Sequence, residues 1–452
     1  MSFWRGKASY RWIILLTCML VYCTSQLVRW NYASITKYLM TDLNIGKPEL
    51  GLLGSAFFYS YAVAQIPWGV ATDMFGGRRV IPIGIAILAF FLMGFALSAT
   101  FTQAIIWRAL MGVVAAAGYV PITSVLAKWF GLKERGFAME MYSGVGGGLG
   151  EALTFLLIPI LAVVMAQGGI FGLDGWRGST AAMGIVILII AISSALMLKS
   201  SPTDIDLPSI QAEEDKTKSD DSEDYKAGVR KIAKDPALWI MSIVWSCYMV
   251  ATRLVPGWLP LYATDFYIQQ EGMSKESAII AGGFMATLYV LGRVFGTPVV
   301  GKISDRLLKR NIPRSVVIGI GLLMIAALFF LFTLRIPTPF LLMVLSFVSG
   351  VAINIFPLIS ASAAEIWSVR SAGFTMGIIN TVGQFAGAMA LSVSGFMAVK
   401  FSVSGGSYET EFLGIWYLGI ATSIFGALAS VYVVMREKGR RKTGLELGDQ
   451  PV

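Results

Sequence analysis

The chain has 452 residues, of which 56% are hydrophobic and only 14% are charged, and its mean hydropathy is +0.69. A soluble protein carries about a quarter charged residues, so this composition excludes a water-soluble domain and places most of the chain in lipid. The sequence has no histidine and no metal or cofactor motif, so we expect neither a metal site nor a cofactor.

Twelve apolar runs are each long enough to cross a bilayer core, which needs about 20 helical residues. The first run begins at Trp12, is too long for a signal peptide and has no cleavage site, so we expect it to be retained. Six runs lie near residues 12–39, 50–72, 80–99, 103–127, 137–166 and 177–198. Six more lie near residues 238–262, 278–301, 315–334, 338–364, 372–399 and 412–435.

A polar segment separates the two sets of runs. It contains QAEEDKTKSDDSEDYK, which has too few apolar residues to form a core. We therefore predict a six-helix bundle over 1–199, a charged linker over 200–235, a second six-helix bundle over 236–436 and a tail over 437–452. Lys and Arg are concentrated in the loops on the side of the N-terminal tail, so the positive-inside rule predicts cytoplasmic termini. These basic residues reflect membrane topology, and no nucleic-acid partner is expected.

The two halves share a loop motif at corresponding positions. GVATDMFGGRR follows the second run and GKISDRLLKR follows the eighth. The glycines would permit close helix packing, and the aspartates and arginines would form a clamp that holds the cytoplasmic side closed. The predicted cytoplasmic gate consists of Gly69, Asp73, Arg78, Arg79, Gly301, Asp305 and Arg306.

Two further pairs of segments echo each other. Pro121 begins a segment containing KWFGLKERG, and Pro357 begins a matching segment containing EIWSVRSAG. In the first run Arg29 precedes a tyrosine by nine residues, and in the seventh Arg253 does the same. Parallel repeats of six helices with a substrate site between them are typical of one class of secondary transporter.

These motifs resemble the major facilitator superfamily over the whole chain except the linker and tails. The resemblance implies an all-α membrane protein with twelve transmembrane helices in two six-helix bundles. Within that superfamily, SQLVRWNYASITKYL around Arg29 and ATRLVPGWLPLYATDF around Arg253 resemble the first and seventh helices of organophosphate:phosphate antiporters and anion:cation symporters. We expect a monomer in the bacterial inner membrane.

Arg29 and Arg253 are the main candidates for substrate binding. An arginine near the centre of a membrane helix costs about 2.5–3.5 kcal/mol on insertion scales, so two at matched depth require a compensating role. A guanidinium presents a planar fork of donors that suits phosphate or carboxylate. The resemblance implies that these two arginines hold the substrate anion from opposite halves. The alternative is that each pairs with a buried carboxylate and only locks helices together.

Two other charged residues are candidates for coupling. Arg108 resembles a superfamily motif in the fourth helix, where the arginine serves either packing or coupling. Glu151 lies on a predicted stripe with Glu140, Gly144 and Gly147, and it is either the partner of a buried arginine or a proton site. The related symporters carry carboxylates where this chain has Val28 and Ala115, and this departure favours anion exchange.

Several polar residues in the predicted helices are further candidates for lining the site. Each of them has interhelical hydrogen bonding as an equally good interpretation. Asn380 and Gln384 lie four residues apart in the eleventh run, so we expect them to face the same way. The set consists of Tyr22, Gln26, Tyr59, Gln65, Asn354, Asn380 and Gln384.

The sequence thus predicts a secondary transporter that moves a small organic anion by alternating access. A phosphate ester, a carboxylate or a sugar acid would suit the arginine pair, so the substrate stays open. Exchange for inorganic phosphate or another anion is the expected mode. The alternatives are proton-coupled symport through Glu151 and a membrane ligand sensor of the same fold. No nucleophile or phosphate-cradling motif supports an enzyme.

Overall fold

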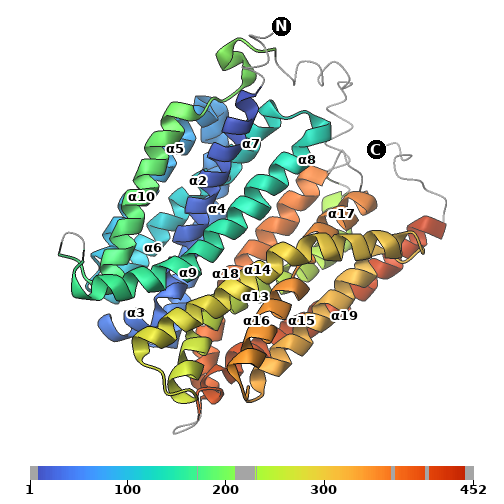
Figure 1. Cartoon of the computed structure of the whole chain (residues 1–452). Helices are drawn as coiled ribbons and strands as arrows, with labels where there is room; N and C mark the ends of the chain where they lie inside the picture. The colour runs from blue at the N-terminus through green and yellow to red at the C-terminus, as the bar shows by residue number, and fades with distance from the viewer. Residues whose placement is uncertain are drawn as a thin grey trace. The chain divides into compact units, whose positions relative to one another are not determined.

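The computed structural model of the chain describes residues 9–169, 172–208, 230, 232–367, 372–402 and 407–442. All regular elements in these ranges are helices (Figure 1). Eleven helical segments among the described residues are long and apolar enough to cross a membrane. The second predicted span is also a helix, α4 (Lys47–Phe75), but its tyrosines, glutamine and proline lower its hydropathy. With α4, the described residues contain the twelve predicted membrane-crossing segments.

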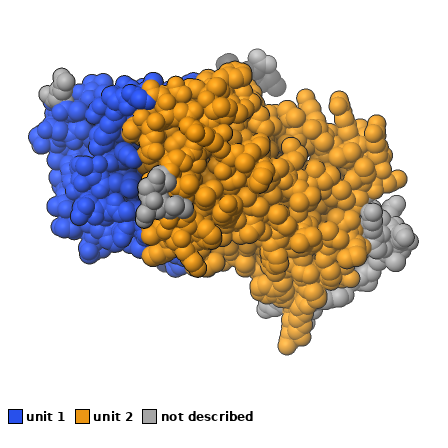
Figure 2. Space-filling view, turned by 90° about the horizontal axis from the view of Figure 1, so that it is seen from below, with its two compact units in different colours: residues 1–219, 272–287 blue, residues 220–271, 288–452 orange. Residues whose placement is uncertain are grey.

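The first compact unit comprises Met1–Ser219 together with Gly272–Thr287, shown in blue in Figure 2. Besides α4, its helices are α2 (Tyr10–Ser34), α3 (Thr36–Asp42), α5 (Gly77–Ala96), α6 (Phe101–Ala115), α7 (Val120–Trp129), α8 (Leu132–Glu140), α9 (Gly147–Val164) and α10 (Gly175–Met197). Shorter helical turns are η1 (Ala116–Gly118), η2 (Met141–Gly146), η3 (Met165–Gln167) and η4 (Pro202–Ile205). Residues 209–229 and 231 of the predicted linker lie outside the described residues.

The second compact unit comprises Asp220–Glu271 and Leu288–Val452. Its helices are α13 (Pro236–Gln269), α15 (Arg314–Thr333), α16 (Pro339–Ala352), α17 (Phe356–Trp367), α18 (Ala372–Phe401), the short η6 (Thr410–Phe412) and α19 (Leu413–Lys442). Helix α19 runs past the predicted bundle end at 436, and the tail from 443 lies outside the described residues.

Helix α14 (Lys275–Leu308) contributes its first turns to the first unit and the remainder to the second. The first turns of α14 pack closely on the first unit at Gly283, where any side chain would overlap the backbone carbonyl of Phe155 in α9. Lys275 also donates a hydrogen bond of 3.2 Å from Nζ to Oγ1 of Thr41. The start of α14 therefore packs on helices from the N-terminal part of the chain.

The fourth and tenth segments repeat each other closely. Thr100 and Thr338 are the N-caps of α6 and α16, and each side chain accepts a backbone hydrogen bond of 3.3 Å from three residues ahead. Both segments are then interrupted, at η1 and at residues 353–355, before a second helix starts beside Pro121 or Pro357. A proline in the first turn lacks only a donor that would have no helical partner.

Close helix contacts also recur at corresponding positions. A side chain at Gly112 of α6 would overlap the carbonyl of Phe57 in α4, and one at Gly350 of α16 would overlap the carbonyl of Tyr289 in α14. Only glycine permits backbones to approach so closely. The structure therefore supports the internal repeat at the level of packing.

The first and seventh segments differ at one end. Helix α2 stops at Ser34 and a separate helix, α3, follows after Ile35, whereas α13 continues unbroken to Gln269. Helix α13 does so although it contains Pro256 and Pro260. The two arginine-bearing helices thus share a pattern of residues but not an identical course.

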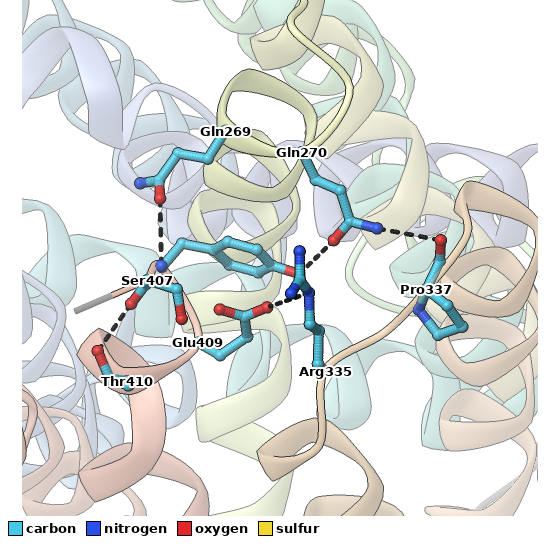
Figure 3. Close-up of polar contacts among 8 residues, drawn as sticks. Gln269, Gln270, Arg335, Pro337, Ser407, Glu409 and Thr410 are labelled. Carbon is cyan, nitrogen blue, oxygen red and sulfur yellow. Dashed lines mark hydrogen bonds and ion pairs between the residues drawn. The ribbon is translucent and has the colours of Figure 1, made fainter.

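Polar side chains join three connections at one end of the second unit (Figure 3). Gln270 donates to the carbonyl of Pro337 at 3.0 Å and accepts from the Tyr408 hydroxyl at 3.3 Å. Arg335 and the buried Glu409 form an ion pair of 3.8 Å. Burial, reinforced by the charge of Glu409, raises the pKa of the Tyr408 phenol above its usual value. These contacts fix the ends of α13 and α15 and the residues just before η6 relative to one another.

Candidate functional site

Arg29 lies in the interior of the first unit. Its side chain is only 7% exposed, and its guanidinium carbon lies 4.7 Å from the ring centroid of Tyr61 and 5.7 Å from that of Phe58, both in α4. Among the described residues no ion pair involves Arg29, and its Nε has no hydrogen-bond partner. A buried cation held mainly against aromatic rings keeps donors available for an anion.

Tyrosines surround this arginine. Tyr22, one of the predicted residues, packs on Tyr119 at 5.8 Å and on Tyr142 at 5.3 Å between ring centroids. The Gln26 amide donates a 3.0 Å hydrogen bond to the Tyr22 hydroxyl. Tyr22 and Tyr61 both lie within electrostatic range of the Arg29 guanidinium. The structure therefore groups two predicted residues, Tyr22 and Gln26, with Arg29.

Glu151 is buried in α9, with 1% of its surface exposed, and lies within electrostatic range of Arg29. Helix α9 comes close to α2, which glycine permits: a side chain at Gly147 would collide with Tyr22, and one at Gly150 would collide with the Cys23 backbone. Gly144 instead faces Glu140 of its own chain segment. The predicted stripe also included Glu140, so the contact between Glu140 and Gly144 agrees with that part of it, and the π-helical turn η2 lies between Glu140 and α9.

Arg253 is the centre of the corresponding group in the second unit. Its side chain is 7% exposed, and its Nη2 donates a hydrogen bond of 2.8 Å to Oε1 of Gln384 in α18. The Gln384 amide in turn donates to Oδ1 of Asn380 at 3.4 Å. A side chain at Gly387 of α18 would lie only 3.1 Å from Cγ of Arg253, so glycine at this position lets α18 pack closely against that arginine. The prediction that Asn380 and Gln384 face the same way is confirmed by these contacts.

Arg108 has a different environment. It is fully buried and donates from Nε, Nη1 and Nη2 to the backbone carbonyls of Leu53, Val28 and Arg29 at 3.1–3.2 Å. Its guanidinium also lies between two aromatic rings, those of Tyr32 at 4.5 Å and Phe57 at 4.6 Å. Its donors are engaged by α2 and α4, so the geometry favours the packing interpretation of this arginine.

Three other predicted lining residues lie away from the arginines' contacts. Asn354 donates from Nδ2 to the carbonyl of Arg293 at 2.8 Å and accepts from Thr297 at 3.0 Å, which joins the tenth segment to α14. Tyr59 and Gln65 are half-buried positions of α4, and Tyr61 occupies the face toward Arg29. For Asn354 the interhelical interpretation is therefore the better one.

The predicted gate residues do not form the expected clamp. Asp305 pairs with Arg314 at 3.0 Å, at the start of α15, whereas Arg306 is exposed. In the first loop, Asp73 is exposed and enters no ion pair within the described ranges. The close packing expected at the glycines is absent in the second loop, where a side chain at Gly301 would meet open space; in the first loop a side chain at Gly69 would be in ordinary contact with Val120, at 3.5 Å.

A groove of about 590 Å³ lies beside the first loop. Its lining residues come from the α4–α5 junction, the end of α10 and the residues that follow α10. Arg78 donates its backbone N–H to the Ser200 hydroxyl at 3.0 Å, which caps the start of α5. The lining consists of Phe75, Arg78, Arg79, Pro82, Ile83, Ala195, Ser200 and Asp204.

Sequence reasoning missed the aromatic half of the Arg29 environment. Tyr61, Tyr119 and Phe58 contact Arg29 or its neighbour Tyr22, yet none was singled out. A usable signal existed in α4, because Phe57, Phe58 and Tyr61 lie three and four residues apart on one helix face. Within the described residues, no cluster of acidic residues or cysteines could hold a metal ion.

Comparison with known proteins identifies the family. A family model described as the Major Facilitator Superfamily matches residues 18–317 and 267–452. The "Probable sulfoacetate transporter SauU" of Cupriavidus necator is 26% identical over 446 residues, which cover 95% of each chain. The "Glycerol-3-phosphate transporter" of Haemophilus influenzae is 24% identical and covers 97% of this chain and 94% of its own. The "Probable hexose phosphate transport protein" of Chlamydia pneumoniae is 24% identical over 71% of this chain and 69% of its own.

Solved structures show the same fold. An inward-facing, unoccupied bacterial homologue of the lysosomal transporter Spinster has a TM-score of 0.76 at 18% identity, covering 96% of this chain and 98% of its own. A D-xylose–proton symporter has a TM-score of 0.69 at 17% identity, covering 95% and 99%. The repeated helices, the glycine contacts and the family match agree, and the chain belongs to the major facilitator superfamily of multi-pass membrane transporters.

Proposed function

We propose that the chain is a secondary transporter of a small organic anion and that Arg29 and Arg253 bind the anionic group. The observation that carries the proposal is the burial of one arginine at 7% exposure in each unit, at corresponding positions of α2 and α13. Arg29 has an unpartnered donor among the described residues, and Arg253 is oriented by Gln384. A buried guanidinium in each unit suits a phosphate, carboxylate or sulfonate.

The names of the relatives support an anionic substrate. They describe proteins that transport hexose phosphate, sulfoacetate or glycerol 3-phosphate. We further propose exchange, with inorganic phosphate or another anion as the counter-substrate. Neither Val28 nor Ala115 can carry a proton, and two buried arginines should hinder reorientation of the carrier when no anion is bound.

Exchange in proteoliposomes tests this function. Vesicles loaded with an anion should take up the same labelled anion from outside by counterflow, and Arg29→Lys and Arg253→Lys should each reduce the uptake at least about tenfold. Lysine keeps the charge but loses the planar fork, so the comparison isolates geometry. Full uptake by both lysine variants would contradict the proposal. Binding without counterflow would identify a ligand sensor.

A second candidate is proton-coupled symport through Glu151. The observation that favours it is the burial of this carboxyl group, at 1% exposure, within electrostatic range of Arg29. A carboxyl group in such a place can bind a proton when the anion neutralises the arginine. Glu151→Gln should then abolish accumulation driven by a pH gradient while leaving counterflow intact. Unchanged gradient-driven accumulation in this variant would exclude symport through Glu151.

We also propose that the protein is a monomer in a bacterial inner membrane with both termini in the cytoplasm. The asymmetric distribution of Lys and Arg among the loops supports the cytoplasmic location of the termini. A reporter that is active only in the cytoplasm should be active when it is fused after residue 208 and when it is fused after residue 442.

A further inference from the structure

Gln26 has an unusual hydrogen-bonding state. Its side chain is 6% exposed, and its Nε2 donates to the Tyr22 hydroxyl at 3.0 Å. Its Oε1 is buried and has no hydrogen-bond partner among the described residues. A buried acceptor without a donor is costly, so such a group points to a partner that arrives with the ligand.

The amide is held in place from two sides. A side chain at Gly147 of α9 would lie 2.7 Å from the Tyr22 ring and 3.3 Å from the Gln26 amide nitrogen, so α9 closes over this pair. Tyr119 and Tyr142 pack against the Tyr22 ring. The Gln26 side chain therefore cannot simply rotate to bring its Oε1 to a hydrogen-bond donor.

Gln26 also shares a helix face with Arg29. Residues three apart on a helix are neighbours on its surface, and Tyr22, which holds Gln26, lies within electrostatic range of the Arg29 guanidinium. An anion bound to Arg29 thus brings its remaining atoms close to the Gln26 amide. A cationic amino group would be repelled by Arg29, which leaves a neutral donor as the fitting partner.

A hydroxyl group satisfies the requirement in either amide orientation. If the Gln26 amide were turned over, its NH₂ would be the orphaned end, and a hydroxyl both donates and accepts. A carboxylate or phosphate oxygen can only accept, so it could not satisfy the amide oxygen. The second unit offers no equivalent, because Val250 precedes Arg253 by three residues and Gln384 already bonds Arg253 and Asn380.

We propose that Gln26 is a specificity-determining residue that accepts a hydrogen bond from a hydroxyl group of the anion bound at Arg29. The inference rests on the proposed function and narrows it, because it separates hydroxylated anions from anions of similar size that have no hydroxyl. Selection of this kind works mainly by rejection: an analogue without the hydroxyl leaves the buried acceptor unpaired.

The test compares matched anions on the purified full-length protein in proteoliposomes. The pairs are glycerol 3-phosphate with propyl phosphate, and gluconate with hexanoate, measured as competitors of counterflow. The wild-type protein should prefer the hydroxylated member of at least one pair by about tenfold. Gln26→Met keeps the length of the side chain and should reduce that preference to about twofold or less, by weakening the hydroxylated member.

The control variant is Gln103→Met, at an exposed position at the start of α6, which should keep the wild-type preference. Equal affinity for both members of each pair in the wild-type protein would overturn the role of Gln26 but leave anion transport standing. An undiminished preference in Gln26→Met would overturn it too. Failure of every anion to bind would refute the proposed function itself. The wild-type comparison needs no variant, so misfolding of Gln26→Met would not leave the question open.

Discussion

Arg253 and Gln384 are joined by a hydrogen bond of 2.8 Å between α13 and α18, and the same glutamine contacts Asn380 one turn away. The neutral amide orients the guanidinium without cancelling its charge. This relationship separates two roles that a buried arginine can have. An arginine paired with a carboxylate would lock two helices, whereas one oriented by an amide retains its attraction for an anion.

Replacing Gln384 therefore gives a graded prediction. Gln384→Glu has nearly the same shape but places a carboxylate on Arg253, and a hydrogen bond to a charged group is worth about 1.5–3 kcal/mol. It should weaken anion binding at least about tenfold, measured as the concentration that half-inhibits counterflow. Gln384→Leu should weaken it less, because it removes a hydrogen-bond partner of Arg253 without adding a negative charge beside the guanidinium. A larger loss of anion binding in Gln384→Leu than in Gln384→Glu would contradict this account of Arg253.

Arg108 is expected to affect stability rather than anion affinity. Its three hydrogen bonds to the carbonyls of Leu53, Val28 and Arg29 hold α2, α4 and α6 together. Arg108→Lys keeps the charge but cannot reach three carbonyls, so we expect a loss of roughly 3 kcal/mol in the free energy of unfolding. Thermal unfolding in detergent measures this loss. A variant with normal stability and abolished counterflow would show instead that Arg108 acts in coupling.

The contact between α2 and α9 predicts a sharp difference between two glycines. A side chain at Gly150 would overlap the Cys23 backbone, six residues before Arg29, whereas one at Gly136 would meet open space. Gly150→Ala should therefore lower the unfolding free energy by about 1–3 kcal/mol and impair anion binding. Gly136→Ala should be neutral or stabilise α8 by up to about 1 kcal/mol, because it removes backbone freedom from the unfolded chain. Equal effects of both substitutions would show that α9 can move away from α2.

Some features of the fold and site could be predicted from the sequence because they depend on local spacing. The twelve apolar runs follow from the thickness of a bilayer, and Asn380 and Gln384 face one way because helical residues four apart do so. The internal repeat gave Arg29 and Arg253, which the structure buries equally.

Other features depend on how helices pack, which spacing alone does not reveal. Tyr61 rather than Tyr59 faces Arg29, and the choice depends on the rotation of α4 about its axis. The π-helical turn η2 departs from the regular α-helical period, and a sequence pattern with that period does not reveal it. The partner of Asp305 is Arg314, on the next helix, and not the neighbouring arginine of the same loop.

Glu437 leads to the last prediction, which concerns the end of α19. This carboxylate is 5% exposed and accepts hydrogen bonds from the hydroxyls of Ser315 in α15 and Ser362 in α17, and from the Ser315 backbone at 3.4 Å. One oxygen thus caps the positive end of α15 while the other holds α17, so a single charge joins three helices.

Glu437→Gln keeps the shape but replaces one accepting oxygen with an NH₂ donor, so one serine hydroxyl must turn to accept instead of donate, and α15 loses its capping charge. We expect a fall of about 1–3 kcal/mol in the free energy of unfolding, measured by thermal or denaturant unfolding in detergent. Glu271→Gln, at an exposed position, is the matched control and should change stability by no more than about 0.5 kcal/mol. If both variants unfolded alike, the buried carboxylate would contribute no more than a surface charge, and the junction of α15, α17 and α19 would have to rest on apolar packing alone.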